Sequence, residues 1–487
     1  MEDILSQAKD KGFVVVNSEQ SSEEGWTQEV QKVYLEVDKL CTIEDPESTP
    51  YVSKYQARDL LDELLKKLEA NKTIASLEHK TALIQKLSQL ISSVQVRIGT
   101  ISWDVEEPHN AQTELESACK YYFPNVIHEI DQLVGDKDDK FSEADAKNES
   151  KEDLLSVVEN LTPPTFPELT LDVAHDALKC LNILGILWAG RGQPIKSLYY
   201  LLSAKQCYVD FRVHAARGKV AGVNLSEIED TYTHNLFYLA QAYGNLKLLH
   251  KSSEFCQETL QRQLSSGLAD LKTALEWVKN CCGIADFYLA LKQFRICALT
   301  LASAEKILKE KIIQKLYSEM QKQIGASTED PLKDTNQRPN FVMGNLNAAE
   351  MEADLHRRWA ILDVQVLRQA SDRWKELQYA QSAGIDQLVV DHTYQNDEET
   401  AKFGEILSRK IVDNGDDNYC FFSGLPVALP PLLVAREIVS FETARIVFLR
   451  SANRIELAKK YYVLDGKCLG FTHSLLLRLK SSRRLCY

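Results

Sequence analysis

Apolar and polar residues alternate at helical spacing along most of this chain. A stripe of leucines in residues 55–68 predicts an amphipathic helix, and a similar stripe predicts another over residues 78–97. One long helix is expected over residues 348–377, and two shorter ones over residues 432–449 and 452–464. Because the strongest periodicity is helical, we predict an all-α fold.

A second pattern, made of small residues, runs across these helices. Gly99, Gly185, Ala240 and Ala285 each follow an apolar residue, and small or medium side chains recur on the next predicted helix. Small residues let two helices approach closely, and the large residues around them fill the remaining space. This pattern is typical of a tetratricopeptide helix-turn-helix unit. The intervals of 86, 55 and 45 residues exceed the roughly 34 of a regular array, so we expect an α-solenoid interrupted by loops.

Changes in composition divide the chain into segments. Charge runs and proline clusters mark the boundaries, because neither continues an amphipathic helix. We expect a flexible N-terminus at 1–25, N-terminal helices with a degenerate first repeat at 26–135, an acidic, proline-containing linker at 136–168, tetratricopeptide-like repeats at 169–322, a flexible loop at 323–346, a C-terminal helical region at 347–466 and a divergent basic tail at 467–487.

Three local features are expected within these segments. Ser226 and Glu229 have the spacing of a capping box at a helix start. Gly283 lies inside a predicted helix, where glycine costs about 1 kcal/mol relative to alanine. A loop is predicted over residues 413–431, because prolines there break the helical pattern.

The net charge of −13 narrows the classes of partner. Nucleic-acid binding requires a concentrated basic surface, so we expect no nucleic-acid partner. An acidic surface favours a basic protein partner, although it also serves ordinary solubility. No stretch approaches the roughly 20 apolar residues that cross a bilayer, and the acidic N-terminus lacks the basic start of a secretion signal. We therefore expect a cytoplasmic protein without membrane insertion.

The chain carries no motif of an enzyme or of a metal site. It contains no Gly-rich phosphate loop, no Gly-x-Ser-x-Gly elbow and no His-Glu-x-x-His pair. Its eleven cysteines form no Cys-x-x-Cys pair, and most lie on apolar helix faces, where a thiol acts as a small hydrophobe. His234 has no sequence neighbour that would orient it as a base, so we expect a binding or capping role. We predict no catalysis, no metal and no cofactor; an enzyme with a helical domain would need a further catalytic domain.

The first helix of a tetratricopeptide pair lines the inner surface of the array. Its exposed positions lie one residue after the small residue, and three and six before it, which gives Gln241, Phe237 and His234 in the central unit. The same positions in the neighbouring units are Asp286, Cys282 and Lys279, and Ile186, Asn182 and Lys179. Phe237 and Ile186 fit a core position equally well. Burying a polar side chain without a partner costs about 1–3 kcal/mol, so the polar members are expected at the surface, in a groove that suits a helical or loop ligand.

Several segments, in this order along the chain, resemble one known family, the kinesin-binding proteins (KBP). Residues 232–243, with the run Tyr-Thr-His-Asn-Leu-Phe-Tyr-Leu-Ala-Gln-Ala-Tyr, are the most specific of them. The others are residues 51–61, 181–188, 261–264, 276–277 and 458–466.

The resemblance implies a right-handed, tetratricopeptide-like α-solenoid in two subdomains. It also implies a non-enzymatic, cytoplasmic and cytoskeleton-associated regulator, which binds kinesin motor domains on the face that meets microtubules. Such a regulator would control axonal and mitochondrial transport, with indirect association with microtubules and mitochondria. An acidic groove would compete with acidic tubulin for the basic face of the motor. The motor contacts implied by the resemblance are Tyr238, Gln241, Arg262 and Gln263; His234, Lys279 and Asp286 are added from repeat geometry.

Two points leave alternatives open. Members of this family continue beyond the Asp465-Gly466 region with further helices, so we expect this chain to be C-terminally shortened or divergent. The alternative function is a generic tetratricopeptide adaptor that binds peptide tails or chaperones through a basic carboxylate clamp. Lys179 and Asn182 would begin such a clamp, but Gln241 and Asp286 do not continue it.

Overall fold

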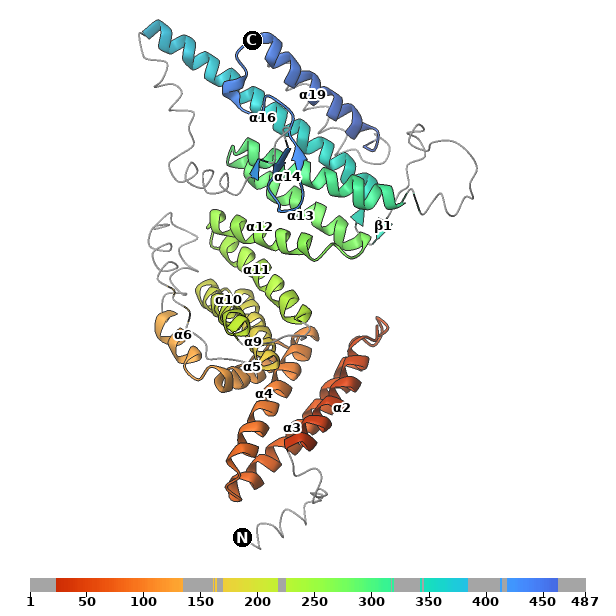
Figure 1. Cartoon of the computed structure of the whole chain (residues 1–487), viewed down its shortest axis with the longest axis vertical. Coiled ribbons are helices and arrows are strands. Elements are labelled where there is room, and N and C mark those ends of the chain that lie inside the picture. The colour runs from red at the N-terminus through yellow and green to blue at the C-terminus, as the bar shows by residue number, and fades with distance from the viewer. Residues whose placement is uncertain are drawn as a thin grey trace. The chain divides into compact units, whose positions relative to one another are not determined.

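The structure is a computed structural model that describes residues 23–134, 161, 163, 170–217, 225–316, 318, 342–343, 346–383, 412–413 and 418–462. These residues form thirteen α-helices and only a few short strands, which confirms the all-α, solenoid-like fold (Figure 1). The predictions for the linker at 136–168 and for the N-terminal and C-terminal tails lie almost wholly outside the described residues. The chain divides into two compact units, Met1–Phe255 and Cys256–Tyr487.

The first unit is a succession of helices that pack on their neighbours in the sequence. Contacts join α3 to α4, α4 to α5, α9 to α10 and α10 to α11, and α9 also packs on α4 and α5. The described helices are α2 (Glu23–Cys41), α3 (Val52–Leu77), α4 (Thr81–Asp104), α5 (Pro108–Tyr122), α6 (Val126–Val134), α9 (Leu171–Gly190), α10 (Pro194–Arg217), α11 (Ser226–Asn245) and the first turns of α12 (Leu249–Ser265).

The second unit combines helices with two small antiparallel sheets. Strand β1 pairs with β2, and β4 lies between β3 and β5. After the rest of α12, the described elements are α13 (Leu271–Ala290), α14 (Phe294–Ile307), a π-helical turn (Leu308–Ile313), β1 (Val342–Met343), β2 (Leu346–Asn347), α16 (Ala348–Ala383), β3 (Val412–Asp413), β4 (Asn418–Cys420), β5 (Val427–Ala428), a 3-10 turn (Ala435–Glu437) and α19 (Phe441–Lys459).

Close helix approach occurs at the small residues that the sequence singled out. A Cβ atom added to Gly99 would lie 2.6 Å from Leu115 Cγ, and one added to Gly185 would lie 2.7 Å from Leu201 Cδ2. Both contacts join the first helix of a pair to the second, α4 to α5 and α9 to α10. Glycine is therefore required at these positions because the facing leucine occupies the space of a side chain.

Successive helix pairs are linked by a recurring side-chain hydrogen bond. Cys180 Sγ on α9 donates to the Leu115 carbonyl oxygen (3.2 Å), and Asn235 Nδ2 on α11 donates to the Leu201 carbonyl oxygen (3.0 Å). The two donors stand five residues before Gly185 and Ala240, respectively, and thus occupy equivalent positions. The repeat pattern accordingly fixes packing between pairs as well as within them.

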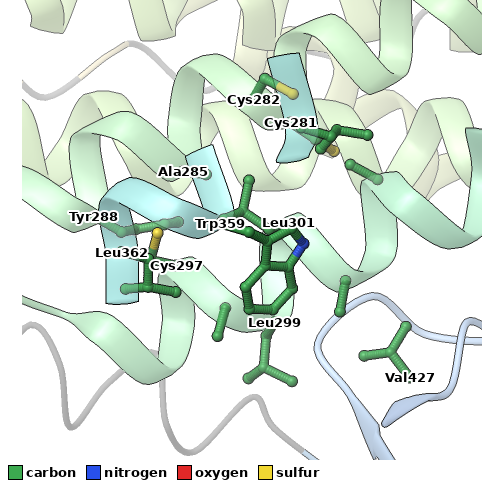
Figure 2. Close-up of a cluster of buried hydrophobic side chains, with 14 of the residues drawn as sticks. Cys281, Cys282, Ala285, Tyr288, Cys297, Leu299, Leu301, Trp359, Leu362 and Val427 are labelled. Atoms are coloured by element: carbon green, nitrogen blue, oxygen red, sulfur yellow. The ribbon is translucent and has the colours of Figure 1, made fainter. Parts of the chain in front are cut away.

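The core of the second unit is built mainly by α13, α14 and α16 (Figure 2). Trp359 of α16 lies within this cluster, and Cys281 and Cys297 are buried in it from α13 and α14. Burial raises the pKa of the thiols of both cysteines well above their usual range. These thiols therefore pack as small apolar groups, as expected.

One helix start differs from the prediction. Helix α11 begins at Ser226 itself, and Leu225 precedes it without a side-chain cap, so the expected Ser226–Glu229 capping box is wrong. A capping box requires its serine to lie one position before the first helical residue. Boxes of that geometry form instead at Asp270 and Ser440, where a threonine occupies the position that usually holds glutamate.

The C-terminal region also differs from the prediction in part. The long helix expected at 348–377 is confirmed as α16, but a single helix, α19, replaces the two expected between 432 and 464. The reason is that Val447, Ser451 and Ile455 form one uninterrupted buried stripe. The predicted loop at 413–431 contains β4 and β5, and it buries Phe421 and Phe422 in the core of the second unit.

Candidate protein-interaction face

Helix α11 presents a stripe of exposed side chains. His234, Phe237 and Gln241 are all exposed, at the spacing of one helix face, while Asn235, Leu236 and Leu239 are buried on the other face. Phe237 is 41% exposed, and its ring centroid lies 5.8 Å from that of Tyr238. Phe237 is therefore at the surface, which decides between the two positions that the sequence allowed. We call His234, Phe237 and Gln241 the α11 stripe.

Tyr238 flanks the α11 stripe but is only half-exposed. Burial raises the pKa of its hydroxyl, and the Asp104 carboxylate raises that pKa further. Because Asp104 is the last residue of α4, its effect places Tyr238 near the C-terminal end of that helix. The hydroxyl remains a neutral donor at physiological pH, so Tyr238 offers a ring edge and a hydrogen bond rather than a charge.

Asn182 does not lie on the surface, in contrast to the prediction. It is buried, its Nδ2 donates to the Thr231 carbonyl oxygen (3.2 Å), and its Oδ1 accepts from Asn235 Nδ2 (2.7 Å). Asn182 thus fastens α9 to α11 inside the first unit. A polar residue can take a core position here because its partners satisfy it, which the single-helix pattern does not reveal.

Several charged residues lie on α2, α4 and α9, and of these only Lys179 was identified from the sequence. Arg97 Nη1 donates to Asp38 Oδ1 (2.7 Å), and its guanidinium lies 3.8 Å from the centre of the Tyr34 ring. The Tyr34 hydroxyl is 2.9 Å from Ser93 Oγ. Arg97 is therefore held by both an ion pair and a cation–π contact.

Helix α9 adds two titratable groups with displaced pKa values. Burial raises the pKa of Asp176 to about 6, although Ser93, Arg97 and Lys179 all oppose the shift. Burial lowers the pKa of Lys179, and the charge of Arg97 lowers it further. Lys179, expected at the surface, is thus partly buried; Asp176, which the sequence analysis did not name, lies three residues before it on one helix face, and this spacing was the available sequence signal.

His175 precedes this pair on α9. Its Nε2 lies 3.0 Å from Thr231 Oγ1, and burial lowers the pKa of the imidazole. The ring is therefore neutral at physiological pH and connects α9 to α11. Its contact with Thr231 adds to the hydrogen bonds of Asn182. These contacts together hold α11, which carries the α11 stripe, against α9.

The remaining predicted contact residues belong to the second unit. Arg262 and Gln263 are half-buried on α12, whereas Lys279 and Asp286 are exposed on α13. Cys282, expected at the surface, is buried because the core of this unit covers that side of α13.

Asp286 is already paired within the second unit. Arg358 Nε lies 3.1 Å from both carboxylate oxygens of Asp286, and Arg358 Nη2 donates to Oδ2 at 3.0 Å. Arg358 also pairs with Asp354 on its own helix. The charge of Asp286 is therefore largely balanced by α16, which leaves less of it for an external partner.

Within the described residues, no cluster of three or more His, Cys, Asp or Glu side chains could hold a metal ion. No helix among them is both long and apolar enough to cross a bilayer. The fold and the α11 stripe thus define the class: an all-α protein of stacked helix pairs that exposes a contiguous polar and aromatic surface on one of its helices.

Comparison with known proteins shows which proteins the chain is similar to. A family model described as "KIF-1 binding protein C terminal" matches residues 275–477. KIF-binding proteins from Danio rerio and Gallus gallus are 23% and 24% identical to this chain, over 88% and 91% of its length, respectively. The relative from Drosophila melanogaster is 24% identical over 91% of the chain. The chain is thus similar to the KIF-binding proteins, in line with the resemblance of its sequence motifs.

The chain spans 64% of the length of each of these three relatives. No solved structure matches it.

Proposed function

We propose that this chain binds kinesin motor domains and thereby blocks their attachment to microtubules. The observation that carries the proposal is the α11 stripe, which exposes an aromatic ring and two hydrogen-bonding side chains within the segment that most resembles the family. The relation to proteins named for binding KIF motors supports the choice of partner.

The chemistry of the stripe fits a helical surface of the motor domain. Phe237 offers an apolar anchor, and His234 and Gln241 offer donors and acceptors on either side of it. Tyr238 would extend the apolar surface toward α4. Exposed acids near the start of the same helix, Glu227 and Asp230, complement a basic partner.

In this proposal the second unit contributes Arg262, Gln263 and Lys279, with Asp286 in a minor role because Arg358 holds it. The protein acts without catalysis, as a right-handed, tetratricopeptide-like solenoid in the cytoplasm. Its cellular role is control of microtubule-based transport, including axonal and mitochondrial transport, through kinesins. The generic adaptor is disfavoured, since burial of Asn182 removes part of the carboxylate clamp.

Direct binding of motor domains tests the proposal. A panel of purified kinesin motor domains is applied to the immobilised full chain and to its Phe237→Ala/Gln241→Ala variant. At least one motor should bind the parent, and the variant should lose about tenfold or more in affinity, as expected for an exposed aromatic anchor with a hydrogen bond.

The matched control is Val213→Ala, which removes an apolar side chain of similar exposure from α10. It should bind like the parent. Failure of every motor domain to bind the parent would refute the proposal, and equal losses in both variants would refute the assignment to the α11 stripe.

A further inference from the structure

A cleft of about 380 Å³ lies on the first unit between α3, α4 and α5. Helix α4 forms its floor, since its contributing residues recur at intervals of three and four; α3 and α5 form the walls. The lining residues are Glu69, Lys72 and Thr73 of α3, Ser88, Ile91, Ser92 and Gln95 of α4, and Ser117 and Tyr121 of α5.

The cleft lies away from the proposed motor-binding region. On α4, the cleft residues Ser92 and Gln95 point roughly opposite to Arg97 and Asp104, because successive residues turn by about 100° around the helix axis. The cleft is therefore a separate site that the proposed function does not use.

Hydrogen bonds within the walls leave the cleft rich in acceptors. The hydroxyls of Ser88, Ser92 and Thr73 each donate to the carbonyl oxygen four residues earlier on their own helix, at 2.8, 3.1 and 3.0 Å. Their protons are thus engaged, and their oxygen lone pairs remain. Gln95 Nε2 donates to Ser117 Oγ (3.1 Å), so the donors of the amide group are also partly engaged.

Carboxylates in and beside the cleft add to its excess of hydrogen-bond acceptors. Glu69 lines the cleft, and Glu114 of α5, which is not one of the lining residues, lies next to the lining residue Gln95. Glu114 Oε2 is buried and has no hydrogen-bond partner among the described residues. Burial raises the pKa of the Glu114 carboxyl, and the carboxylates of Asp62 and Glu69 raise it further, whereas a hydrogen bond with Gln95 lowers it. A cation bound beside Glu69 and Gln95 would lessen the repulsion between these carboxylates.

We propose that this cleft binds an arginine or lysine side chain from a basic segment of a partner protein. A guanidinium group carries five donors, which match the acceptors of Glu69, Ser88 and Ser92. Tyr121, 38% exposed at the wall, provides an aromatic face for a cation–π contact. Lys72 is the only cation among the lining residues, and it weakens the site by like-charge repulsion.

The test uses two short fluorescent peptides with the full chain. One is acetyl-Gly-Arg-Gly-Arg-Gly-amide, and the other carries citrulline, the neutral isostere of arginine, at both arginine positions. Fluorescence anisotropy should show saturable binding of the arginine peptide only. Glu69→Gln should weaken binding about tenfold, as loss of a charge-assisted hydrogen bond does, and Lys72→Met should strengthen it.

Two controls separate this site from other effects. Phe237→Ala on α11 should leave peptide binding unchanged, so failure of motor binding and failure of this site remain distinguishable. Thermal unfolding of Glu69→Gln should match the parent, since Glu69 is exposed. Absence of arginine-peptide binding, equal binding of the citrulline peptide or an unchanged affinity in Glu69→Gln would each overturn the proposal.

Discussion

At the scale of single residues, packing explains which small positions matter. Gly185 is enclosed by Leu201, whereas a Cβ added to Gly283 would meet nothing within 4 Å. Both glycines lie inside helices, so their intrinsic cost to helix formation is the same. Their surroundings decide the outcome of a substitution.

Gly185→Ala should therefore destabilise the protein by roughly 1–3 kcal/mol, because the new methyl group overlaps Leu201. Gly283→Ala should instead stabilise it by up to about 1 kcal/mol, through helix propensity alone. Urea denaturation of the two variants measures both effects. Equal effects of the two substitutions would contradict the close approach of α9 and α10.

Asp176 gives a prediction about pH. Its pKa of about 6 in the folded state exceeds the ordinary 3.8 of an aspartate, so its contribution to stability is fully present below pH 3.8. That contribution is lost as the pH rises through 6. Asp176→Asn removes the buried charge, so it should raise the free energy of unfolding at pH 8 by roughly 1–3 kcal/mol.

At pH 4 the same substitution should have little effect, because the parent side chain is then mostly protonated. The control is Asp172→Asn, on the exposed side of the same helix, which should have a much smaller effect at pH 8 because the Asp172 carboxylate adds only a minor repulsion at Asp176. Denaturation curves at the two pH values provide the measurement. A larger effect of Asp176→Asn at pH 4 than at pH 8 would show that the sign of the shift is wrong.

At the scale of elements, α19 is fixed to α16 by an ion pair whose acid is fully buried. Arg450 Nη2 lies 2.6 Å from Asp363 Oδ1, and Asp363 has no exposed side-chain surface. Arg454 provides a second link, since it donates to Glu305 of α14 and lies 2.9 Å from His356 Nδ1. These arginines therefore connect three helices of the second unit.

Arg450→Met should destabilise the second unit by about 3–5 kcal/mol, because it leaves a buried carboxylate without a partner. The matched control is Arg445→Met, whose arginine forms an exposed pair with Glu442 on α19 itself. That variant should change stability by less than about 1 kcal/mol. Chemical denaturation distinguishes the two, and similar small losses would contradict a structural role for the buried pair.

Helical periodicity was sufficient to predict α16 and the glycine contacts, because both depend on patterns within one or two helices. It failed where partners from other helices decide burial. Asn182 is internal only because Thr231 and Asn235 satisfy it, and Cys282 is covered by the core of the second unit. The exposure of His234 and Gln241 on α11 was predicted correctly since no described element covers that face, whereas the sequence left the position of Phe237 open.

At the scale of the whole molecule, the proposed binding function is supported by the similarity of the chain to the KIF-binding proteins. The acidic net charge of −13 is consistent with a basic partner, and the α11 stripe offers a specific surface for it. Charge alone would give only weak, salt-dependent attraction. Specific inhibition requires that the protein and microtubules compete for one face of the motor.

Microtubule co-sedimentation tests this competition most directly. Kinesin motor domains are pelleted with microtubules in the presence of a non-hydrolysable ATP analogue. The assay is run without the protein, with an excess of the full chain, and with an excess of the Phe237→Ala/Gln241→Ala variant. We predict that the parent shifts at least one motor into the supernatant and that the variant does so much less. A motor that binds the protein yet pellets unchanged with microtubules would contradict inhibition by occlusion.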